Sequence, residues 1–343
     1  MKQNLVRESN IELLRIISMF MVLALHVNGA AILYPQINDV ISMPTQSFMR
    51  FLNTFLCIDA VNIYILISGW FGIKYKKKGF LNLIFQCLFF SISIYALFAI
   101  IGQVQINKIN IMSSFFLMYG NAYWFVWCYL VLYLLAPVLN SFTENTDKDT
   151  FKRVLISLFI VQTILSIFTL HNFYKSGFSP LSFINLYLLA RYFSIYRIVP
   201  SKMKCLIGFL CCVIINTLLC FLPMHVLGIE NSTIPSIAIA YINPLNIAGA
   251  LFILLLFIQF KFKSRIINWI SASCLAVYLL HCHFCIYEYF TDIARYIYNN
   301  YNGIGYYFII ITFMTLTFII AIFIDKIRIA CFNLLSSKLR INT

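Results

Sequence analysis

Charged side chains are scarce in this chain, and their scarcity excludes a soluble globular protein. Only 10% of the 343 residues are charged, whereas 62% are hydrophobic, and a soluble domain carries about 25% charged residues. A soluble core cannot bury such an excess of apolar side chains. Long polar segments are also absent, since the longest is Ser141–Thr150. The composition therefore predicts an integral membrane protein without a soluble domain.

Apolar runs long enough to cross a bilayer follow one another along the chain. About 20 apolar residues in a helix span the hydrocarbon core. We expect an all-α polytopic integral membrane protein, one membrane-embedded domain over residues 1–343, with a short basic tail at 325–343. A hydropathy window predicts ten transmembrane helices, at 11–33, 50–73, 80–101, 122–140, 152–171, 181–199, 204–222, 235–260, 266–287 and 304–324.

The distribution of Lys and Arg predicts the orientation of these helices. Of the 25 basic residues, nineteen fall in alternate loops and at both termini, and four, Arg50, Lys108, Lys175 and Arg295, fall in the remaining loops. Because basic residues concentrate in cytoplasmic loops, both termini are expected in the cytoplasm of a multi-pass protein of the inner (plasma) membrane. The net charge of +14 lies in short loops, which favours contact with anionic lipids and not with nucleic acid.

The cysteines predict neither a disulfide framework nor a metal centre. Most of the eleven are scattered through the apolar runs, where Cys behaves as a small hydrophobic residue. The segment His281-Cys282-His283-Phe284-Cys285 has a Cys-x-x-Cys spacing. No second ligand pair of this kind exists elsewhere, and a tetrahedral site takes four ligands. We therefore expect no metal and no bound cofactor.

Ionisable residues lie inside the predicted membrane helices. Arg15 and His26 are eleven positions apart in the first apolar run, which sets them about 16 Å apart along a helix. Asp59 and Arg191 lie in the second and sixth runs. A charged group at such a depth costs about 2.5 to 3.5 kcal/mol on insertion scales, so it should face the protein interior or a wet cavity. These residues predict chemistry inside the membrane.

Four segments, in their order and spacing, resemble the membrane acyltransferase 3 family over essentially the whole chain. The first-helix signature is Arg15-x10-His26 within Ser9-Asn10-Ile11-Glu12-Leu13-Leu14-Arg15, and the second-helix segment is Val61 to Phe71, with Ser68-Gly69-Trp70. The others are Tyr123-Trp124-Phe125, running on to Leu134-Leu135-Ala136-Pro137, and Ala276-Val277-Tyr278-Leu279-Leu280-His281. The resemblance implies an enzyme that O-acylates sugars and other acceptors. Many members carry Asp where this chain has Asn62.

Two arginines suit the charged end of an acyl-CoA donor. Acyl-CoA is made in the cytoplasm and carries several phosphates at one end of a long flexible arm. Arg15 and Arg191 are both expected in the cytoplasmic half of their helices, and a guanidinium binds phosphate through a planar fork. The Arg15–His26 separation is comparable to the reach of the pantetheine arm, which would bring the thioester to the imidazole.

His26 is the predicted catalytic group, with Asp59 and Asn62 as helpers. A neutral imidazole takes a proton from an acceptor hydroxyl or attacks the thioester itself. Asp59 is expected at a similar depth and would orient His26, while Asn62 would donate to a developing oxyanion. The alternatives are a buried His26 that only packs, and an Asp59 that pairs with Arg50 or another basic group.

Five further residues are predicted to line the acceptor cavity: Ser68, Trp124, Tyr278, His281 and Glu288. His281 is expected at a depth similar to that of His26, although a packing role is equally consistent with the sequence. Glu288 would bind sugar hydroxyls, and its alternative is an exposed surface acid.

The sequence thus favours a membrane O-acyltransferase that takes an acyl group, acetyl first, from cytoplasmic acyl-CoA to a hydroxyl of a cell-surface or lipid-linked glycan. The alternative is a carrier or flippase for a polyprenyl-linked sugar or similar amphiphile, which also needs intramembrane charges. The sequence shows no inverted repeat and no pair of broken helices, which counts against the carrier. A purely structural subunit would not need ionisable residues within its spans.

Overall fold

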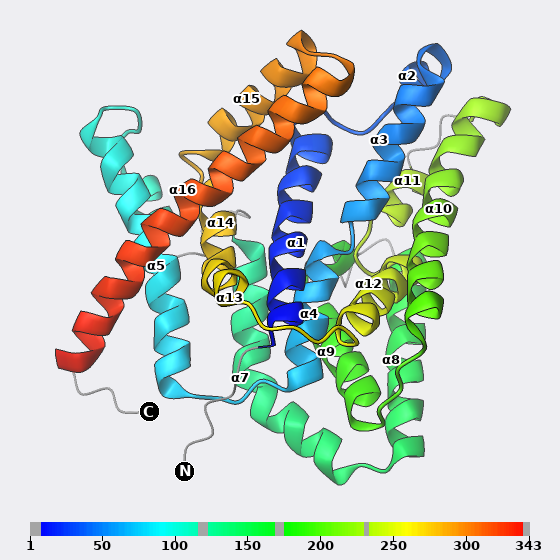
Figure 1. The fold of residues 1–343 in the computed structure, drawn as a ribbon, viewed down its shortest axis with the longest axis horizontal. Coiled ribbons are helices and arrows are strands. Elements are labelled where there is room, and N and C mark those ends of the chain that lie inside the picture. Colours follow the sequence, from blue (N-terminus) through cyan, green and yellow to red (C-terminus); the bar gives the residue numbers. More distant parts are fainter. Residues whose placement is uncertain (1–7, 116–122, 169–174, 230–232, 339–343) are drawn as a thin grey trace. The chain divides into compact units, whose positions relative to one another are not determined.

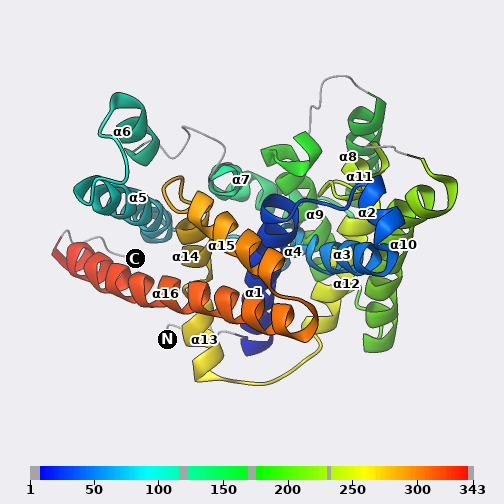
Figure 2. The ribbon, with the colours of Figure 1, turned by 90° about the horizontal axis from the view of Figure 1, so that it is seen from above.

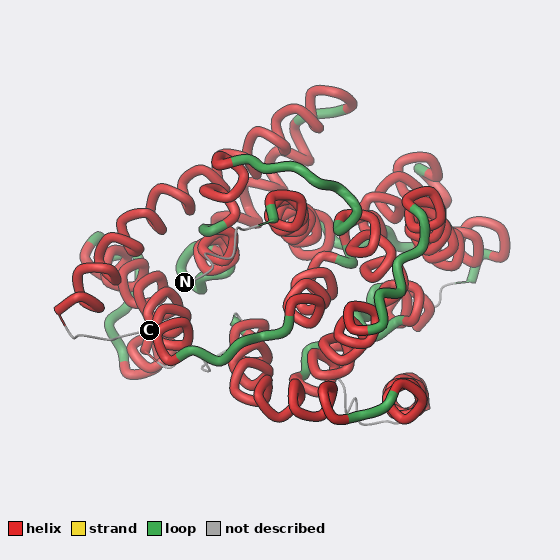
Figure 3. The backbone as a smooth tube through the Cα atoms, turned by 60° about the horizontal axis from the view of Figure 1, so that its bottom comes forward, coloured by secondary structure: helices red, strands yellow, loops and turns green. Residues whose placement is uncertain are grey.

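A computed structural model describes residues 8–115, 123–168, 175–229 and 233–338, and its regular structure in these ranges is entirely helical (Figure 3). Six helical segments are long and apolar enough to cross a membrane, which makes the chain a multipass membrane protein. They are Ser9–Ala31, Pro44–Phe71, Lys77–Ile100, Trp124–Asn145, Lys202–Leu227 and Gly303–Ser337. The orientation of the termini and the count of ten spans stay predictions.

The described chain forms two compact units. The first comprises residues 1–73 and 135–268, and the second comprises residues 74–134 and 269–343. The helices of the first unit are α1 (Ser9–Leu25), the π-helical η1 (His26–Ala31), α2 (Ile37–Ser42), α3 (Pro44–Cys57), α4 (Ala60–Phe71), α8 (Lys148–Phe168), the short η2 (Lys175–Gly177), α9 (Pro180–Ile195), α10 (Lys202–Leu227), α11 (Thr233–Ala238) and α12 (Pro244–Phe257). The second unit contains α5 (Lys77–Ile100), α6 (Lys108–Phe115), α14 (Cys274–His281), α15 (Tyr287–Asn300) and α16 (Gly303–Lys338). One boundary between the units follows Ile73, and the other two fall within α7 (Trp124–Asn145) and α13 (Arg265–Ser271).

Proline marks where three helices of the first unit begin. Pro44, Pro180 and Pro244 open α3, α9 and α12, because the fixed φ of proline suits the first helical turn and its missing N–H is not needed there. The side chains of Ser179 and Asn243 cap α9 and α12 by accepting from the N–H groups of Ser182 and Leu245.

Helix α4 is the centre of the first unit. It packs against α1, α9 and α12, and α10 packs against both α3 and α12 (Figures 1 and 2). Gly69 brings α4 and α9 together, since a Cβ there would lie 2.5 Å from the carbonyl oxygen of Tyr187 and 2.9 Å from the Cβ of Ala190. The glycine of the Ser68-Gly69-Trp70 motif therefore permits backbone-to-backbone packing.

The second predicted span is broken. Helix α3 ends at Cys57 and α4 begins at Ala60, with Ile58 and Asp59 between them. Two later predicted spans, 235–260 and 266–287, are also divided, into α11 and α12 and into α13 and α14. The prediction that no helix is broken was wrong for these three apolar runs, because a hydropathy window averages over an interruption of two to five residues.

Helix α16 does not end where the last predicted span does. It continues from Gly303 to Lys338 and packs on α5, α14 and α15 in the second unit (Figure 1). Asp325 and Arg328, placed at the start of the basic tail by the sequence, are buried and form an ion pair of 2.8 Å. Because the two charges neutralise each other one turn apart, the helix continues past them.

Candidate active site

Arg15 lies on the second turn of α1, and two polar contacts hold this part of the helix. Its Nη1 donates to Glu12 Oε1 at 2.6 Å, and the side chain is 32% exposed against 6% for Glu12. The hydroxyl of Tyr64 on α4 donates to the carbonyl oxygen of Arg15 at 2.6 Å. The guanidinium has five N–H donors, so the Glu12 contact leaves others for an anionic ligand.

The start of α1 is itself anchored within the first unit. Asn10 donates to the carbonyl oxygen of Phe257, where α12 ends, at 2.9 Å. Ser9 Oγ accepts from the N–H of Ser264 at 2.8 Å. The first-helix signature of the sequence therefore includes residues that fix the position of Arg15 and not only residues that bind substrate.

Arg191 on α9 is set against the end of α4. Gly72, which follows α4, has φ +72, and a Cβ there would lie 3.1 Å from Arg191 Nη1. Glycine is suited both to this backbone conformation and to the close approach of the guanidinium. The Nε–H of Arg191 is a buried donor without a hydrogen-bond partner. A buried unsatisfied donor is costly, and an anionic ligand would satisfy it.

A polar network rigidifies the turn beside Arg191. The hydroxyl of Tyr187 accepts from the N–H of Ile73 at 3.0 Å and donates to Asn140 Oδ1 at 2.6 Å. Asn140 Nδ2 donates to the carbonyl oxygen of Ile73 at 2.9 Å. Helices α7 and α9 thus hold the residue after Gly72 by both its backbone groups.

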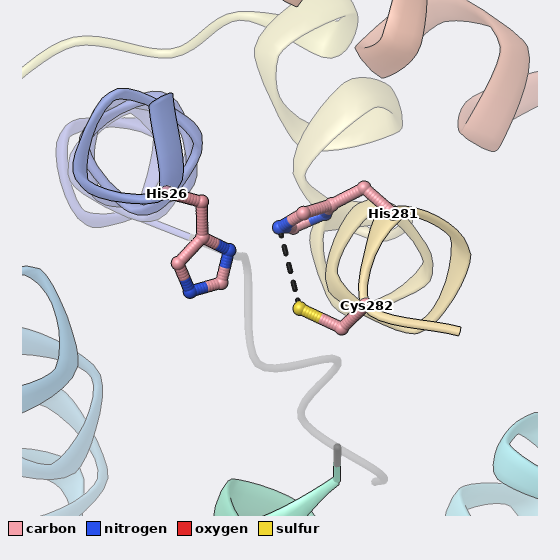
Figure 4. Close-up of side chains that lie close together, drawn as sticks. All are labelled: His26, His281 and Cys282. Atoms are coloured by element: carbon pink, nitrogen blue, oxygen red, sulfur yellow. Dashed lines mark hydrogen bonds between the residues drawn. The ribbon is translucent and has the colours of Figure 1, made fainter. Parts of the chain in front are cut away.

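His26 lies where α1 changes into the π-helical segment η1 (His26–Ala31). Single π-turns within α-helices are rare and are frequent at functional sites. Glycine at position 29 lets the ring of Tyr34 approach the segment closely, since a Cβ there would lie 2.6 Å from the hydroxyl of Tyr34. The imidazole of His26, drawn in Figure 4, is thus carried by an irregular turn at the end of α1.

Asp59 and Asn62 are both buried in the first unit, but not as partners of His26. Among the residues that the structure describes, no hydrogen bond or ion pair joins Asp59 to His26 or to Arg50. From the Tyr64–Arg15 contact, Asp59 lies five residues, or about 7 Å, along the chain before Tyr64, and His26 lies about 16 Å along α1.

The predicted aromatic residues of the second unit form one cluster. The ring of Tyr278 lies 5.9 Å from that of Tyr123 and 6.0 Å from that of Phe125, and Trp124 lies 6.1 Å from Phe125. The hydroxyl of Tyr123 donates to the carbonyl oxygen of Leu279 at 2.6 Å. The third and fourth segments that resemble the family, which begin at Tyr123 and at Ala276, therefore contact each other.

His281 is fully buried in the second unit with both ring nitrogens in hydrogen bonds. Its Nδ1 lies 2.6 Å from the carbonyl oxygen of Val277, and its Nε2 lies 3.4 Å from Cys282 Sγ (Figure 4). Since a carbonyl oxygen only accepts, Nδ1 carries the proton and the thiol donates to Nε2. The nearby His283 contacts the backbone of Ser91 and Cys285.

The remaining predicted cavity residues are Ser68 and Glu288. The hydroxyl of Ser68 donates back to the carbonyl oxygen of Tyr64 at 3.0 Å within α4. Glu288 is exposed in the first turn of α15, where a negative charge suits the helix dipole. The structure thus places Arg15, His26, Asp59, Asn62, Ser68 and Arg191 in the first unit, and Trp124, Tyr278, His281 and Glu288 in the second.

Two buried polar clusters were missed by the sequence reasoning. In the first unit Asn216 donates to Asn246 Oδ1 at 2.8 Å, and Asn246 donates to the carbonyl oxygens of Ala238 and Ala240. In the second unit Gln86 and Arg328 donate to Asp325 Oδ1. The available signal was a polar side chain within an apolar run, as at Gln86 and Asn216.

The match to known families decides which chemistry this arrangement serves. A family model described as an acyltransferase domain matches residues 8–324. The chain belongs to the acyltransferase 3 family. No curated protein and no solved structure matches it. As an acyltransferase 3 protein whose described residues include six helical segments able to cross a membrane, it is a membrane acyltransferase that acts on an acyl donor and an acceptor.

Proposed function

We propose that this acyltransferase moves an acyl group, with acetyl as the first candidate, from cytoplasmic acyl-CoA to a hydroxyl of a cell-surface or lipid-linked glycan. The observation that carries the proposal is the guanidinium of Arg191, whose buried Nε–H has no partner and whose Nη1 lies against Gly72. A donor in this state suits a phosphate oxygen. Basic residues in the predicted inner loops favour a donor that comes from the cytoplasm.

The donor would lie along the first unit. Arg15 lies on α1 and Arg191 lies on α9, and both helices pack against α4. Tyr64 contacts the backbone of Arg15, and Gly72 lies beside the guanidinium of Arg191. Tyr64 on α4 and Gly72 just after its end are eight positions apart, or about 12 Å. The phosphates of one CoA would reach both arginines, and the pantetheine arm would extend along α1 toward His26.

His26 would then promote the transfer. Its neutral imidazole takes the proton from the acceptor hydroxyl, whose oxygen attacks the thioester carbonyl. The carbon–sulfur bond breaks, and the departing thiolate of CoA takes the proton back from the imidazolium. Attack by the imidazole itself, followed by transfer from an acyl-imidazole to the hydroxyl, has the same balance. Both routes place the thioester and the acceptor at the end of α1.

The acceptor side of the proposal rests on Ser68, Trp124, Tyr278, His281 and Glu288, whose predicted cavity roles stay predictions. The predicted roles of Asp59 and Asn62 in catalysis stay predictions too. We propose no bound cofactor and no metal in the reaction, with acyl-CoA as co-substrate, and we place the protein in the plasma membrane with both termini in the cytoplasm.

The carrier keeps one observation in its favour, the break between α3 and α4, because transporters place substrate and ion sites at discontinuous helices. Membership of an acyltransferase family weighs against it. A carrier moves its cargo without breaking a thioester, so the two functions differ in their chemistry.

Radiolabelled acetyl-CoA separates these functions. Membranes from cells with and without the gene would be incubated with the labelled donor, and the labelled product identified chemically. We expect label in a glycan or lipid-linked sugar only when the gene is present. Equal incorporation in both membranes, with the protein shown to be folded and inserted, would contradict the proposal. A longer acyl-CoA tested in parallel identifies the acyl group.

A further inference from the structure

Ile58 and Asp59 form an irregular, buried turn between α3 and α4. The N–H of Ile58 donates to Thr54 at the end of α3, and the N–H of Ile63 donates to Asp59 at the start of α4. Both residues between the helices keep right-handed helical backbone angles, with φ −60 and ψ −27 at Ile58 and φ −71 and ψ −8 at Asp59. The irregular turn therefore lies inside one segment of 28 residues that can span a membrane by length and composition.

Asp59 adds an uncompensated carboxylate at this break. Its side chain is 2% exposed, and Oδ1 has no hydrogen-bond partner. Its Oδ2 lies against Gly249 of α12, where a Cβ would overlap it. None of the ion pairs between described residues includes Asp59. An isolated buried carboxylate is strongly unfavourable unless a cation or a proton neutralises it.

Asn62 presents a second unpartnered oxygen one turn further along the same face of α4. Its Nδ2 donates to the carbonyl oxygen of Tyr241 at 2.9 Å, which fixes the orientation of the amide. Its Oδ1 is buried and has no partner. The two unsatisfied atoms are thus both acceptors, and they require a ligand that is a cation or a hydrogen-bond donor. A role for Asn62 as a donor to an oxyanion would not satisfy its Oδ1.

We propose that Asp59 and Asn62 form a binding site for one monovalent cation, with Na⁺ as the first candidate. Carboxylate and amide oxygens are ligands of hard cations, and transporters place cation sites at interruptions of their membrane helices. A single carboxylate matches a single positive charge. The bound ion would link the break to α12, which faces Asp59 through Gly249.

The binding of radioactive sodium to the purified full-length protein tests this site. We expect about one saturable ion per chain, and a thermal unfolding midpoint that rises when NaCl replaces choline chloride at equal ionic strength. Asp59→Asn, which removes the charge and keeps the shape, should lose both effects. Glu144→Gln removes an exposed carboxylate of the same unit and should keep both.

Gly249→Ala provides a second variant in case Asp59→Asn does not fold. The added Cβ displaces Oδ2 of Asp59 without removing the carboxylate, so the apparent sodium affinity should fall about tenfold or more, as expected when a charged contact is displaced. Gly305→Ala is its control, since a Cβ there meets no atom within 4 Å. Sodium binding that is absent from the folded wild type, or equal in wild type and Asp59→Asn, would overturn the proposal. Stabilisation by Asp59→Asn without any sodium response would also overturn it and identify a protonated Asp59. None of these readouts depends on acyl transfer.

Discussion

Replacement of His26 by alanine should lower the rate of acyl transfer by about 10² to 10⁴-fold, the usual contribution of a general base, and by more if the imidazole forms a covalent intermediate. His26 is the ionisable group of the irregular turn at the end of α1, eleven residues from Arg15. Without the imidazole nothing accepts the proton of the acceptor hydroxyl. The rate of labelled product formation by purified, reconstituted protein is the measurement.

His225→Ala is the matched control for this variant. His225 is exposed near the end of α10 and stacks on Phe221, so its removal should leave the rate within a factor of about two. Both proteins should insert and unfold at nearly the same temperature as the wild type. Near-full activity of folded His26→Ala would remove His26 from the mechanism.

Substitution of Arg15 by lysine should raise the apparent KM for acyl-CoA by about tenfold or more, because each lost charge-assisted hydrogen bond costs about 1.5 to 3 kcal/mol. Lysine keeps the positive charge that pairs with Glu12 but lacks the planar fork that grips phosphate. The KM for the acceptor should change little. Arg191→Lys should behave in the same way and also leave space beside Gly72.

Arg153→Lys controls for the replacement of a guanidinium by an ammonium group outside the proposed donor site, since Arg153 is an exposed residue of α8 that contacts Thr150. Its donor KM should equal that of the wild type. The double variant Arg15→Ala and Arg191→Ala gives the strongest test. Unchanged acyl-CoA binding by the folded double variant would show that the two arginines have another role and that the donor binds elsewhere.

The sequence predicts the family and the residues of the first helix well, because several short motifs that occur in the order and spacing of a family identify that family together. The segment from Ser9 to Arg15 shows why. Asn10 fastens α1 to the end of α12, Ser9 fastens it to Ser264 before α13, and Glu12 pairs with Arg15. The glycine in Ser68-Gly69-Trp70 likewise has a packing reason, the close approach of α9.

Other features depend on contacts between distant segments, which no local pattern encodes. Two predicted depths suggested that Asp59 would meet His26, but no hydrogen bond or ion pair joins the two side chains among the described residues. The Asn140–Tyr187 network that holds Ile73 joins residues far apart in the chain. Asp325 and Arg328 looked like the start of a tail because hydropathy scores each charge alone and not the neutral pair that they form.

The central claim, that this protein breaks a thioester supplied from the cytoplasm, is tested most directly with sealed vesicles of known orientation and impermeant acetyl-CoA. Inside-out vesicles that contain a suitable glycan acceptor should consume the donor and release free CoA. Right-side-out vesicles should consume none until they are permeabilised. Movement of a glycan between leaflets without CoA release in either orientation, in a preparation shown to be folded, would contradict the account and establish a carrier.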